Sequence, residues 1–383
     1  MKIKSIRTVQ YSPKSPSLAD HPQRRRDPWP AAGPVANPMT EYPRYAAYRP
    51  DWMPRFAGGY ACVVEAEDGT VGFAPVGQGQ PAALVIDDHL GPLLLGEDAL
   101  ATEKIYDMAL RMCTPYGAAG LASFAISALD LALWDLKGKL LGLPVYSLIG
   151  GPAKDEMTCY ATGADTDWYL ELGFGAVKLP CPYGPADGLD GLRKNVDLIR
   201  RTRDQIGDER DLMLDCWMAF DVEYAVRLAE EIRPYKVRWL EDCLRPDDFK
   251  GHEQLRKRIP WQGLATGEHW HTAAPFQHAA GEGLVDIFQP DINWVGGMTA
   301  LLQISALARA ANIKVIPHAG GNTAYGQHAC FGLPGIPWTE YFVGTPPGIP
   351  LEETVTEGLS TPVGGKLVPS AAPGFGIPYE PET

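Results

Sequence analysis

No part of the 383-residue chain approaches the run of about 18 apolar residues that a membrane-spanning helix needs. The N-terminal segment MKIKSIRTVQYS also lacks the apolar stretch of a secretory signal peptide. We therefore expect a cytoplasmic protein without a membrane span.

Positive charge is in the minority, with 34 Lys and Arg residues against 47 Asp and Glu residues and a formal net charge of −13. Nucleic acids and anionic membranes are bound by clustered Lys and Arg, so the composition argues against both as partners. A small anionic substrate is not excluded, because local residues set the electric field inside a cleft.

Two further patterns are missing. The seven cysteines include no CxxC pair of the kind found in metal sites, so we expect buried, reduced thiols. The chain also lacks a GxGxxG segment between a strand and a helix, which argues against a nicotinamide-dependent oxidoreductase. The isolated GQG at Gly77–Gly79 is expected to form a turn.

What the sequence has is a regular alternation of short apolar runs and longer amphipathic segments. The runs predict eight strands at 156–161, 174–179, 211–217, 237–243, 263–269, 285–291, 313–318 and 338–343. The segments between them predict helices at 187–206, 221–233, 246–258, 273–282 and 297–311. Such alternation predicts an α/β fold with a parallel sheet, and eight units predict closure into a (β/α)7-8 barrel of the TIM type.

The N-terminal part shows a different pattern. Residues 2–11 predict a strand, and the alternating segment 59–77 predicts a hairpin that turns at Asp68-Gly69. Segment 123–142 predicts a strong helix that ends at Gly142.

We expect three parts: an α+β capping domain over 1–125, the barrel over 126–344, and a C-terminal segment, 345–383, that packs back on the capping domain. Residues 12–58 are rich in Pro, Arg and aromatic residues and show no period, so we expect a loop that covers the substrate.

Acidic residues end three successive predicted strands: Asp215, Glu241 and Glu268. A single acid at such a place often caps a loop, but three at matched positions would repel one another in a closing cleft unless a cation is present. Their hard oxygen ligands suit Mg²⁺. Asp242 should face the other way in its strand, and Asp286 is expected to be structural.

The next two strands end in Asp291 and His318. A carboxylate that binds one imidazole nitrogen fixes the tautomer and raises the basicity of the other nitrogen. A core histidine held by a hydrogen bond is the plainer alternative, but the neighbouring acids favour a general base. A base that faces a metal suits removal of the proton next to a substrate carboxylate, with Lewis-acid stabilisation of the enediolate.

The segments LMLDCWMAFDVEYA, WLEDCLRPDD, TGEH, QPDINWVGG and VIPHAG resemble the mandelate racemase subgroup of the enolase superfamily. Within it, NPMTEYPRY, ALDLALWDLKGKLLGLPVYSLIGG, YATGA, KLPCPYGPADG and PGFGI are most similar to the L-rhamnonate dehydratases. Enzymes of this superfamily are known to combine Mg²⁺ with a Lys or His base. The resemblance spans nearly the whole chain.

The resemblance implies roles for individual residues. Asp215, Glu241 and Glu268 would bind Mg²⁺, Asp291 and His318 would form the catalytic dyad, and Glu340 would lie near the reacting centre. Substrate contacts would come from Arg49, His269, Trp29 and Lys178. Lys178 has a second interpretation, as a structural partner of a ligand carboxylate. The resemblance also implies a homo-oligomer.

Two departures from the family pattern stand out. The dehydratases carry a His just before the loop Trp, whereas Pro28 precedes Trp29 here, and His21 or Arg24–Arg26 are candidates to replace that contact. Lys178 is followed by Leu179 and Pro180 rather than by a second Lys, which argues against a racemase with two bases.

The sequence therefore predicts a Mg²⁺-dependent hydro-lyase that removes the C2 proton and the C3 hydroxyl of an acid sugar to give a 2-keto-3-deoxy acid. The first alternative is an epimerase, racemase or cycloisomerase of the same superfamily. A remote alternative is a sugar-acid binding protein without catalysis.

Overall fold

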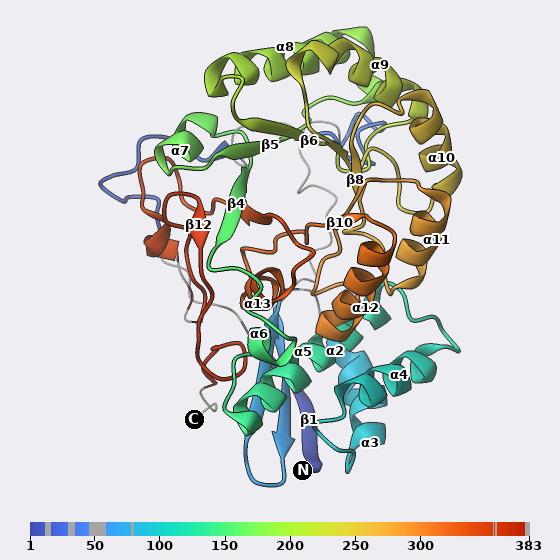
Figure 1. Cartoon of the computed structure of the whole chain (residues 1–383), viewed down its shortest axis with the longest axis vertical. Helices are drawn as coiled ribbons and strands as arrows, with labels where there is room; N and C mark the ends of the chain where they lie inside the picture. The colour runs from blue at the N-terminus through green and yellow to red at the C-terminus, as the bar shows by residue number, and fades with distance from the viewer. Residues whose placement is uncertain are drawn as a thin grey trace.

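The computed structural model describes residues 1–11, 17–29, 35–45, 59–77, 80–354, 356 and 358–379. A ring of strands surrounded by helices forms one part of the molecule, and a small sheet with its own helices lies beside it (Figure 1). Among the described helices, none combines the length and apolar character that crossing a bilayer requires.

The small sheet has three antiparallel strands. Strand β1 (Ile3–Gln10) pairs with β2 (Tyr60–Ala66), and β2 pairs with β3 (Val71–Val76). The β2–β3 turn places Gly69 at a φ of 86°, a left-handed conformation that favours glycine. The predicted N-terminal strand and the hairpin at Asp68-Gly69 are both confirmed.

Helices follow the hairpin and lead to the barrel. They are α2 (Gln80–Val85), the π-helical turn η2 (Ile86–Leu90), α3 (Gly91–Leu94), α4 (Thr102–Cys113) and α5 (Leu121–Leu141). Helix α5 is the strong helix that the sequence predicts, and it ends where Gly142 turns left-handed at a φ of 66°.

Two buried carboxylates of α5 join the parts of the molecule. Asp135 accepts hydrogen bonds of 2.9 Å from the amides of Phe73 in β3 and Phe375 near the C-terminus. Asp130 accepts from the amide and the hydroxyl of Thr299, at 3.0 and 2.6 Å. Thr299 belongs to the barrel helix α12 (Gly297–Ala310). One helix therefore holds the small sheet, the C-terminal segment and the barrel.

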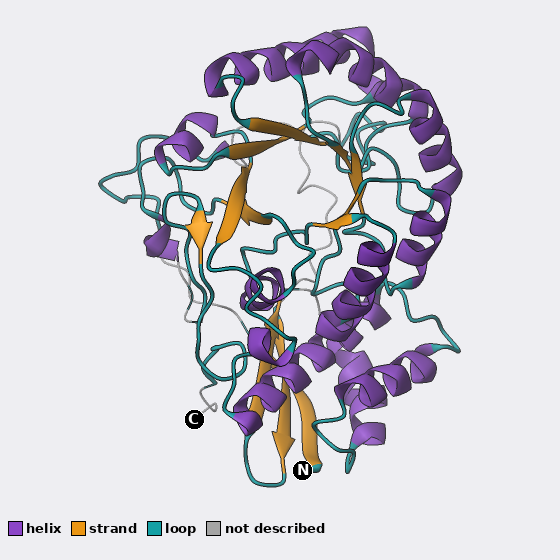
Figure 2. Ribbon diagram, in the orientation of Figure 1, coloured by secondary structure: helices purple, strands orange, loops and turns teal. Residues whose placement is uncertain are grey.

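The second sheet is the predicted barrel of eight parallel strands, in the order β10, β9, β8, β7, β6, β5, β4, β11 (Figure 2). The short strand β12 (Lys366–Leu367) adds to β4 in the antiparallel sense. The path ends at β10 and β11, where the amide of Gly321 donates to the carbonyl of Glu340 at 2.7 Å. The strands are β4 (Met157–Thr162), β5 (Ala176–Pro180), β6 (Asp211–Asp215), β7 (Leu240–Glu241), β8 (Leu264–Thr266), β9 (Ile287–Phe288), β10 (Lys314–Val315) and β11 (Thr339–Phe342).

A layer of inward side chains fills the barrel, one from each strand or from a residue directly adjoining it. This packed layer closes the barrel below its mouth, so chemistry is confined to the carboxyl ends of the strands. The layer consists of Tyr160, Ala176, Met213, Trp239, Ala265, Ile287, Ile316 and Trp338.

Helices cover the outside of the ring. They are α6 (Val145–Leu148), α7 (Thr166–Glu171), the 3₁₀ turn η3 (Pro185–Asp187), α8 (Gly188–Ile206), α9 (Val222–Ile232), the 3₁₀ turn η4 (Arg233–Tyr235), α10 (Phe249–Arg258), α11 (Ala274–Glu282), α12 and α13 (Ala324–Gly332). A last 3₁₀ turn, η5 (Leu351–Thr354), lies in the C-terminal segment. The five helices predicted between strands are all present.

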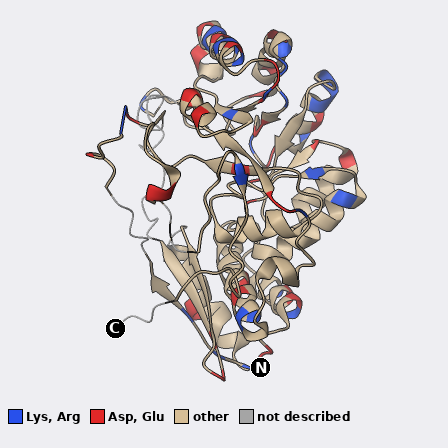
Figure 3. Cartoon of the chain, turned by 60° about the vertical axis from the view of Figure 1, so that its left-hand side comes forward, with Lys and Arg blue, Asp and Glu red and all other residues tan. Residues whose placement is uncertain are grey.

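Basic and acidic residues alternate along the outer helices (Figure 3). On α8, Lys194 pairs with Asp190 at 2.6 Å and Arg200 pairs with Asp197 at 2.7 Å. Such exposed pairs contribute little stability, so they mark a solvated face. All seven cysteines are buried and unpaired, as predicted.

A close contact between α5 and the C-terminal segment gives the first prediction. A Cβ at Gly138 would overlap the backbone of Gly374, whereas a Cβ at Gly281 in α11 would meet nothing within 4 Å. Replacing a helix-interior glycine by alanine normally stabilises by about 0.5–1 kcal/mol. We expect Gly281→Ala to follow this rule and Gly138→Ala to destabilise by about 1–3 kcal/mol through overpacking. Urea unfolding measures the change in unfolding free energy of both variants. A more stable Gly138→Ala variant would contradict the close contact with Gly374.

Candidate active site

The predicted metal ligands and the predicted His–Asp pair lie at one rim of the barrel. Asp215 and Glu241 are the last residues of β6 and β7 and pair in register. Because all eight strands run in parallel, their carboxyl ends converge on one mouth. The other predicted residues of this rim belong to or follow the remaining strands: Lys178 in β5, Glu268 after β8, Asp291 after β9, His318 after β10 and Glu340 in β11.

The structure brings the predicted His–Asp pair together. His318 Nδ1 lies 2.7 Å from Asp291 Oδ2, and since a carboxylate only accepts, Nδ1–H is the donor. Asp291 is itself held by the amide of Asn293 at 2.7 Å. His318 Nε2 lies 3.5 Å from Glu268 Oε2. The second imidazole nitrogen therefore faces the carboxylate group.

Lys178 is fully buried and surrounded by acids. Its Nζ forms ion pairs with Glu241 Oε1 and, at 2.6 Å, with Glu340 Oε1, and it lies 3.7 Å from Asp215 Oδ2. Of the two interpretations of Lys178, these contacts favour the structural partner of carboxylates.

Both Glu340 oxygens are engaged by the protein. Oε1 also accepts from Thr162 Oγ1 at 2.5 Å, and Oε2 accepts from the amide of Ala319 at 2.8 Å. Ala319 has a φ of 49°, which an alanine rarely adopts. Glu340 therefore fixes the backbone directly after His318.

Burial dominates the ionisation of this rim. It raises the pKa of Asp215, Glu241 and Glu268 above the ordinary carboxyl range, although Lys178 lowers the first two and His318 the third. Neighbouring carboxylates add to the increase in each case. Burial alone would lower the pKa of His318, but the charge of Glu268 and the hydrogen bond to Asp291 raise it to about 10.

A second His–Asp pair lies beside the first. His269 Nδ1 is 3.0 Å from Asp242 Oδ2, and Asp242 Oδ1 accepts from the hydroxyl of Thr266. Asp242 and His269 are 27 residues apart, the same interval that separates Asp291 from His318. That repeated interval is the sequence signal for the pair, and the sequence interpretation missed it.

The expectation that Asp242 faces away from the site is wrong. Strand alternation fails here because Asp242 has a φ of 44°, so its side chain turns to the same rim as Glu241. Asp242, Glu268 and His269 offer ligand atoms that all lie within 4.8 Å of one another. Asp215 and Glu241 lie outside this group, and Glu241 is instead held by Lys178, Trp239 Nε1 and Gln289 Nε2.

The donor set at this rim fits a hard divalent cation. Asp215 and Glu241 end adjacent strands, and Glu268 follows the next strand. Glu241 and Glu268 are buried, Asp215 is partly buried, and burial together with neighbouring carboxylates opposes the ionisation of all three. A divalent cation would compensate the charges of Asp215, Glu241 and Glu268 together, which the single ammonium of Lys178 does not.

Aromatic rings flank both histidines. The ring of Trp294 lies 5.2 Å from that of His318 and 5.8 Å from that of His269. Trp294 belongs to the predicted QPDINW segment but was not singled out from the sequence. The indole therefore packs against both imidazoles.

The described parts of loop 12–58 lie on the barrel. Trp29 donates its amide to Asp165 Oδ2 at 2.8 Å, and Ala36 donates to the carbonyl of Cys181, after β5, at 2.8 Å. Arg49 lies outside the described residues, so its predicted substrate contact has no structural counterpart here. His21, a candidate to replace the missing loop His, accepts from the amide of Gln23.

The arginines Arg24–Arg26 are occupied by acids of the protein. Arg24 pairs with Asp27, Arg25 with Glu171 at 2.8 Å, and Arg26 with Asp165 and Asp167 at 2.5 Å each. These contacts do not support Arg24–Arg26 as replacements for the loop His.

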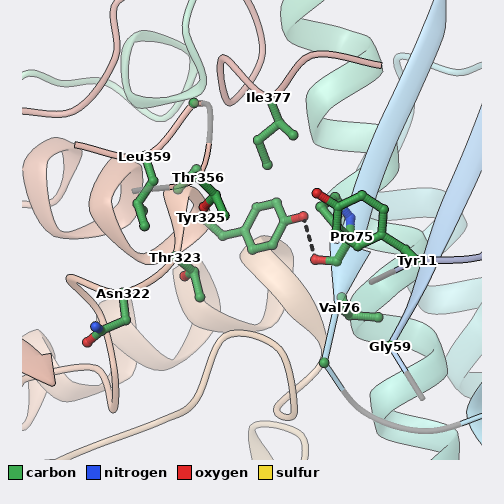
Figure 4. Close-up of a pocket in the computed structure, with 13 residues that line it drawn as sticks. Tyr11, Gly59, Pro75, Val76, Asn322, Thr323, Tyr325, Thr356, Leu359 and Ile377 are labelled. Carbon is green, nitrogen blue, oxygen red and sulfur yellow. Dashed lines mark hydrogen bonds between the residues drawn. The ribbon is translucent and has the colours of Figure 1, made fainter. Parts of the chain in front are cut away.

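A cavity of about 280 Å³ lies where β3 meets the start of α13 (Figure 4). Tyr325 Oη donates to the carbonyl of Pro75 at 3.0 Å across this seam. Tyr11 and Gly59, which flank loop 12–58, also line the cavity. Its described lining contains none of the predicted catalytic or ligand residues.

The molecule combines an α+β cap with a parallel barrel, and acids and a His–Asp pair lie at the ends of the barrel strands. This combination is typical of barrel enzymes whose active site lies at the carboxyl ends of the strands. Residues 163–383 match the family described as Enolase C-terminal domain-like. Residues 60–150 match the mandelate racemase / muconate lactonizing enzyme N-terminal domain. The chain belongs to the mandelate racemase subgroup of the enolase superfamily.

Several known proteins resemble this chain over nearly its whole length. The L-rhamnonate dehydratase of Saccharopolyspora erythraea is 41% identical over 386 residues, which cover 100% of this chain and 97% of the relative. The crystal structure of rhamnonate dehydratase from Gibberella zeae complexed with Mg has 34% identity and a TM-score of 0.90, covering 99% and 94% of the two chains. The 3,6-anhydro-D-galactonate cycloisomerase of Zobellia galactanivorans has 26% identity and a TM-score of 0.75, covering 98% and 96%.

Removing the buried ammonium gives the second prediction. Lys178→Met leaves carboxylates buried without their partner, and we expect a loss of about 3–5 kcal/mol in unfolding free energy at pH 8 without added divalent cation. Carboxyl groups whose folded pKa lies above the unfolded value destabilise the fold when ionised. The deficit should therefore shrink as the pH falls to 5.5 and they protonate.

Urea unfolding at both pH values measures this effect. Lys154→Met is the matched control, because the Lys154 ammonium contacts backbone carbonyls of Cys330, Leu333 and Ile336. An equal deficit for Lys178→Met at pH 8 and pH 5.5 would show that its partners are not buried carboxylates.

Proposed function

We propose that this protein is a Mg²⁺-dependent acid-sugar dehydratase of the L-rhamnonate dehydratase type. It would convert a 2,3-dihydroxy acid into a 2-keto-3-deoxy acid and water. The geometry of His318 carries the proposal: Nδ1 is fixed 2.7 Å from Asp291, and Nε2 faces the carboxylate group from 3.5 Å. The full-length similarity to an L-rhamnonate dehydratase supports the substrate class.

We assign the ligand role to Asp215, Glu241 and Glu268. Bound there, Mg²⁺ supplies Lewis-acid stabilisation for negative charge that develops at a substrate carboxylate. Burial and neighbouring acids raise the pKa values of these three residues and so oppose their ionisation. A bound cation would favour the ionised forms and offset this effect, which supports the assignment. Asp242 and His269 neighbour Glu268 and complete the polar surroundings of the site.

His318 acts first as the base and then as the acid. Its Nε2 takes the proton from the carbon next to the carboxylate, and the resulting imidazolium gives a proton to the departing C3 hydroxyl. The enol product then becomes the 2-keto acid. Because Glu268 contributes strongly to the raised pKa of His318, compensating the charge of Glu268 moves that pKa toward the working range.

The other predicted residues have supporting roles in this proposal. Glu340 holds the backbone after His318 and lies at the same rim. Lys178 compensates Glu241 and Glu340, which supports its role as a structural partner of these carboxylates over a role as a substrate contact. His269, Trp29 and Arg49 are proposed substrate contacts.

The sequence also predicts three parts, and we retain them as a proposal: 1–125, 126–344 and 345–383. In support, the described C-terminal segment contacts the small sheet, where Arg7 donates to Tyr379 Oη at 2.9 Å and the rings of Phe73 and Tyr379 lie 5.1 Å apart.

A cytoplasmic homo-oligomer is likewise proposed. Seven unpaired, buried cysteines suit a reducing compartment. Leu84, Leu93 and Leu95, around α2 and α3, each expose half or more of their surface and suit contact with another copy of the chain.

Turnover of acid sugars tests the function directly. With Mg²⁺ and a panel of aldonic and aldaric acids, we expect 2-keto-3-deoxy product, most rapidly from L-rhamnonate. His318→Asn should lower kcat by at least about a hundredfold while the fold is retained, since it removes the general base. Near-native turnover by that variant would exclude His318 as the base.

Deuterium exchange distinguishes a dehydratase from the alternative enzymes of the same superfamily. An epimerase, a racemase or a cycloisomerase would leave an acid sugar that carries solvent deuterium at C2 without loss of water. A dehydratase releases the keto acid instead. No metal-dependent conversion of any acid sugar would favour a binding protein without catalysis.

The ligand role is tested by binding. Glu241→Gln removes one charge from the proposed Mg²⁺ site, and we expect the affinity for Mg²⁺ to fall by about 10–100-fold in isothermal titration calorimetry. Asp247→Asn, at an exposed acid paired with Arg245, serves as the matched control. Equal affinity in the Glu241→Gln variant and the wild type would remove Glu241 from the ligand set.

A further inference from the structure

The predicted substrate residue Trp29 is seated on the end of β4. A Cβ added at Gly163, the residue directly after β4, would overlap Trp29 Nε1 and Tyr169 Oη. Gly163 has a φ of 139°, so both the space and the backbone require glycine there. The indole therefore lies directly against the barrel backbone.

This seat adjoins the proposed catalytic rim. The amide of Gly163 donates to the carbonyl of Lys178 at 2.9 Å. The preceding residue, Thr162, donates its hydroxyl to Glu340 at 2.5 Å. The backbone against which Trp29 packs therefore belongs to the residue directly after Thr162, whose side chain is part of the polar cluster at the mouth.

A single buried carboxylate holds this end of the loop. Asp165 Oδ2 accepts from the amide of Trp29 at 2.8 Å, and Oδ1 pairs with Arg26 Nη1 at 2.5 Å. Arg26 Nη2 also pairs with Asp167 at 2.5 Å, but the Asp167 side chain is 56% exposed. Buried, charge-assisted hydrogen bonds contribute more than exposed ion pairs.

The rest of the loop segment has separate attachments. Arg25 donates its amide to the carbonyl of Pro347 at 2.9 Å, and its guanidinium pairs with Glu171 at 2.8 Å. Loss of Asp165 would therefore free the end of the segment that carries Trp29 and leave the start attached.

We propose that Asp165 is a positioning residue for Trp29. By holding the Trp29 amide and the Arg26 guanidinium, it places the indole as a fixed wall on the β4 side of the mouth. That wall contributes to the binding of the acid sugar. The part concerning substrate rests on the proposed function, whereas the seating of the indole does not.

Kinetics test the effect on substrate. Asp165→Ala should raise KM by about tenfold and change kcat by less than about threefold, because a binding wall is lost and the general base is untouched. Asp165→Asn keeps an oxygen that can accept from the Trp29 amide but loses the charge, so an intermediate KM is expected. Asp167→Ala is the matched control, with a change in KM below about twofold.

A double-mutant cycle tests whether Asp165 acts through Trp29. If it does, Asp165→Ala has no further effect on KM in the Trp29→Ala background, where the ring that forms the wall is absent. Independent, multiplying effects of the two substitutions would overturn the proposal. So would an unchanged KM in both Asp165→Ala and Trp29→Ala.

Fluorescence tests the seating without substrate. Asp165→Ala should shift tryptophan emission to longer wavelength as the indole meets water, and the shift should be absent when Trp29 is already Phe. Asp167→Ala should give no shift. If the wild type converts no acid sugar, the proposed function fails while this measurement still decides the seating. An unshifted emission in Asp165→Ala overturns the seating, whatever the turnover.

Discussion

The chemistry at the mouth depends on how one buried ammonium is surrounded by carboxylates. Lys178 lies among Glu241, Glu340 and Asp215, where burial removes the compensation that bulk water would give their charges. One positive charge is too little for all the acids of this rim, so burial and mutual repulsion raise the pKa values of Asp215, Glu241 and Glu268. A divalent cation bound at this rim would offset the imbalance, which supports the proposed ligand role. The proposed ligand role therefore depends on the shared position of these acids at the strand ends as well as on each residue.

The same strand ends arrange the proposed proton-transfer group. Two Asp–His pairs lie close together, and the ring of Trp294 packs against both imidazoles. The pairs differ in their surroundings: His318 also faces Glu268, whereas His269 belongs to the group with Asp242 and Glu268. Repetition of one strand-and-helix unit thus provides two similar side-chain pairs, and their neighbours give them different proposed roles.

Much of the fold was predictable because its signals are local and repeated. Eight apolar runs with polar ends predict parallel strands, and the strand ends then place His318 beside Asp291. Asp242 was misjudged, since strand alternation does not anticipate its φ of 44°. The contact of Asp165 with Trp29 joins residues 136 positions apart and has no local signal. The role of Arg49 stays a prediction, because the described residues do not include it.

Helix α5 has a consequence for the active site although none of its side chains is placed there. Asp135 holds the hairpin and the C-terminal segment, while Asp130 holds the start of α12. The small sheet is thereby fixed in its orientation to the barrel. Tilting the small sheet against the barrel would break buried hydrogen bonds on both sides of α5, so we expect the mouth to adjust to substrate in its loops and not by a movement of the small sheet.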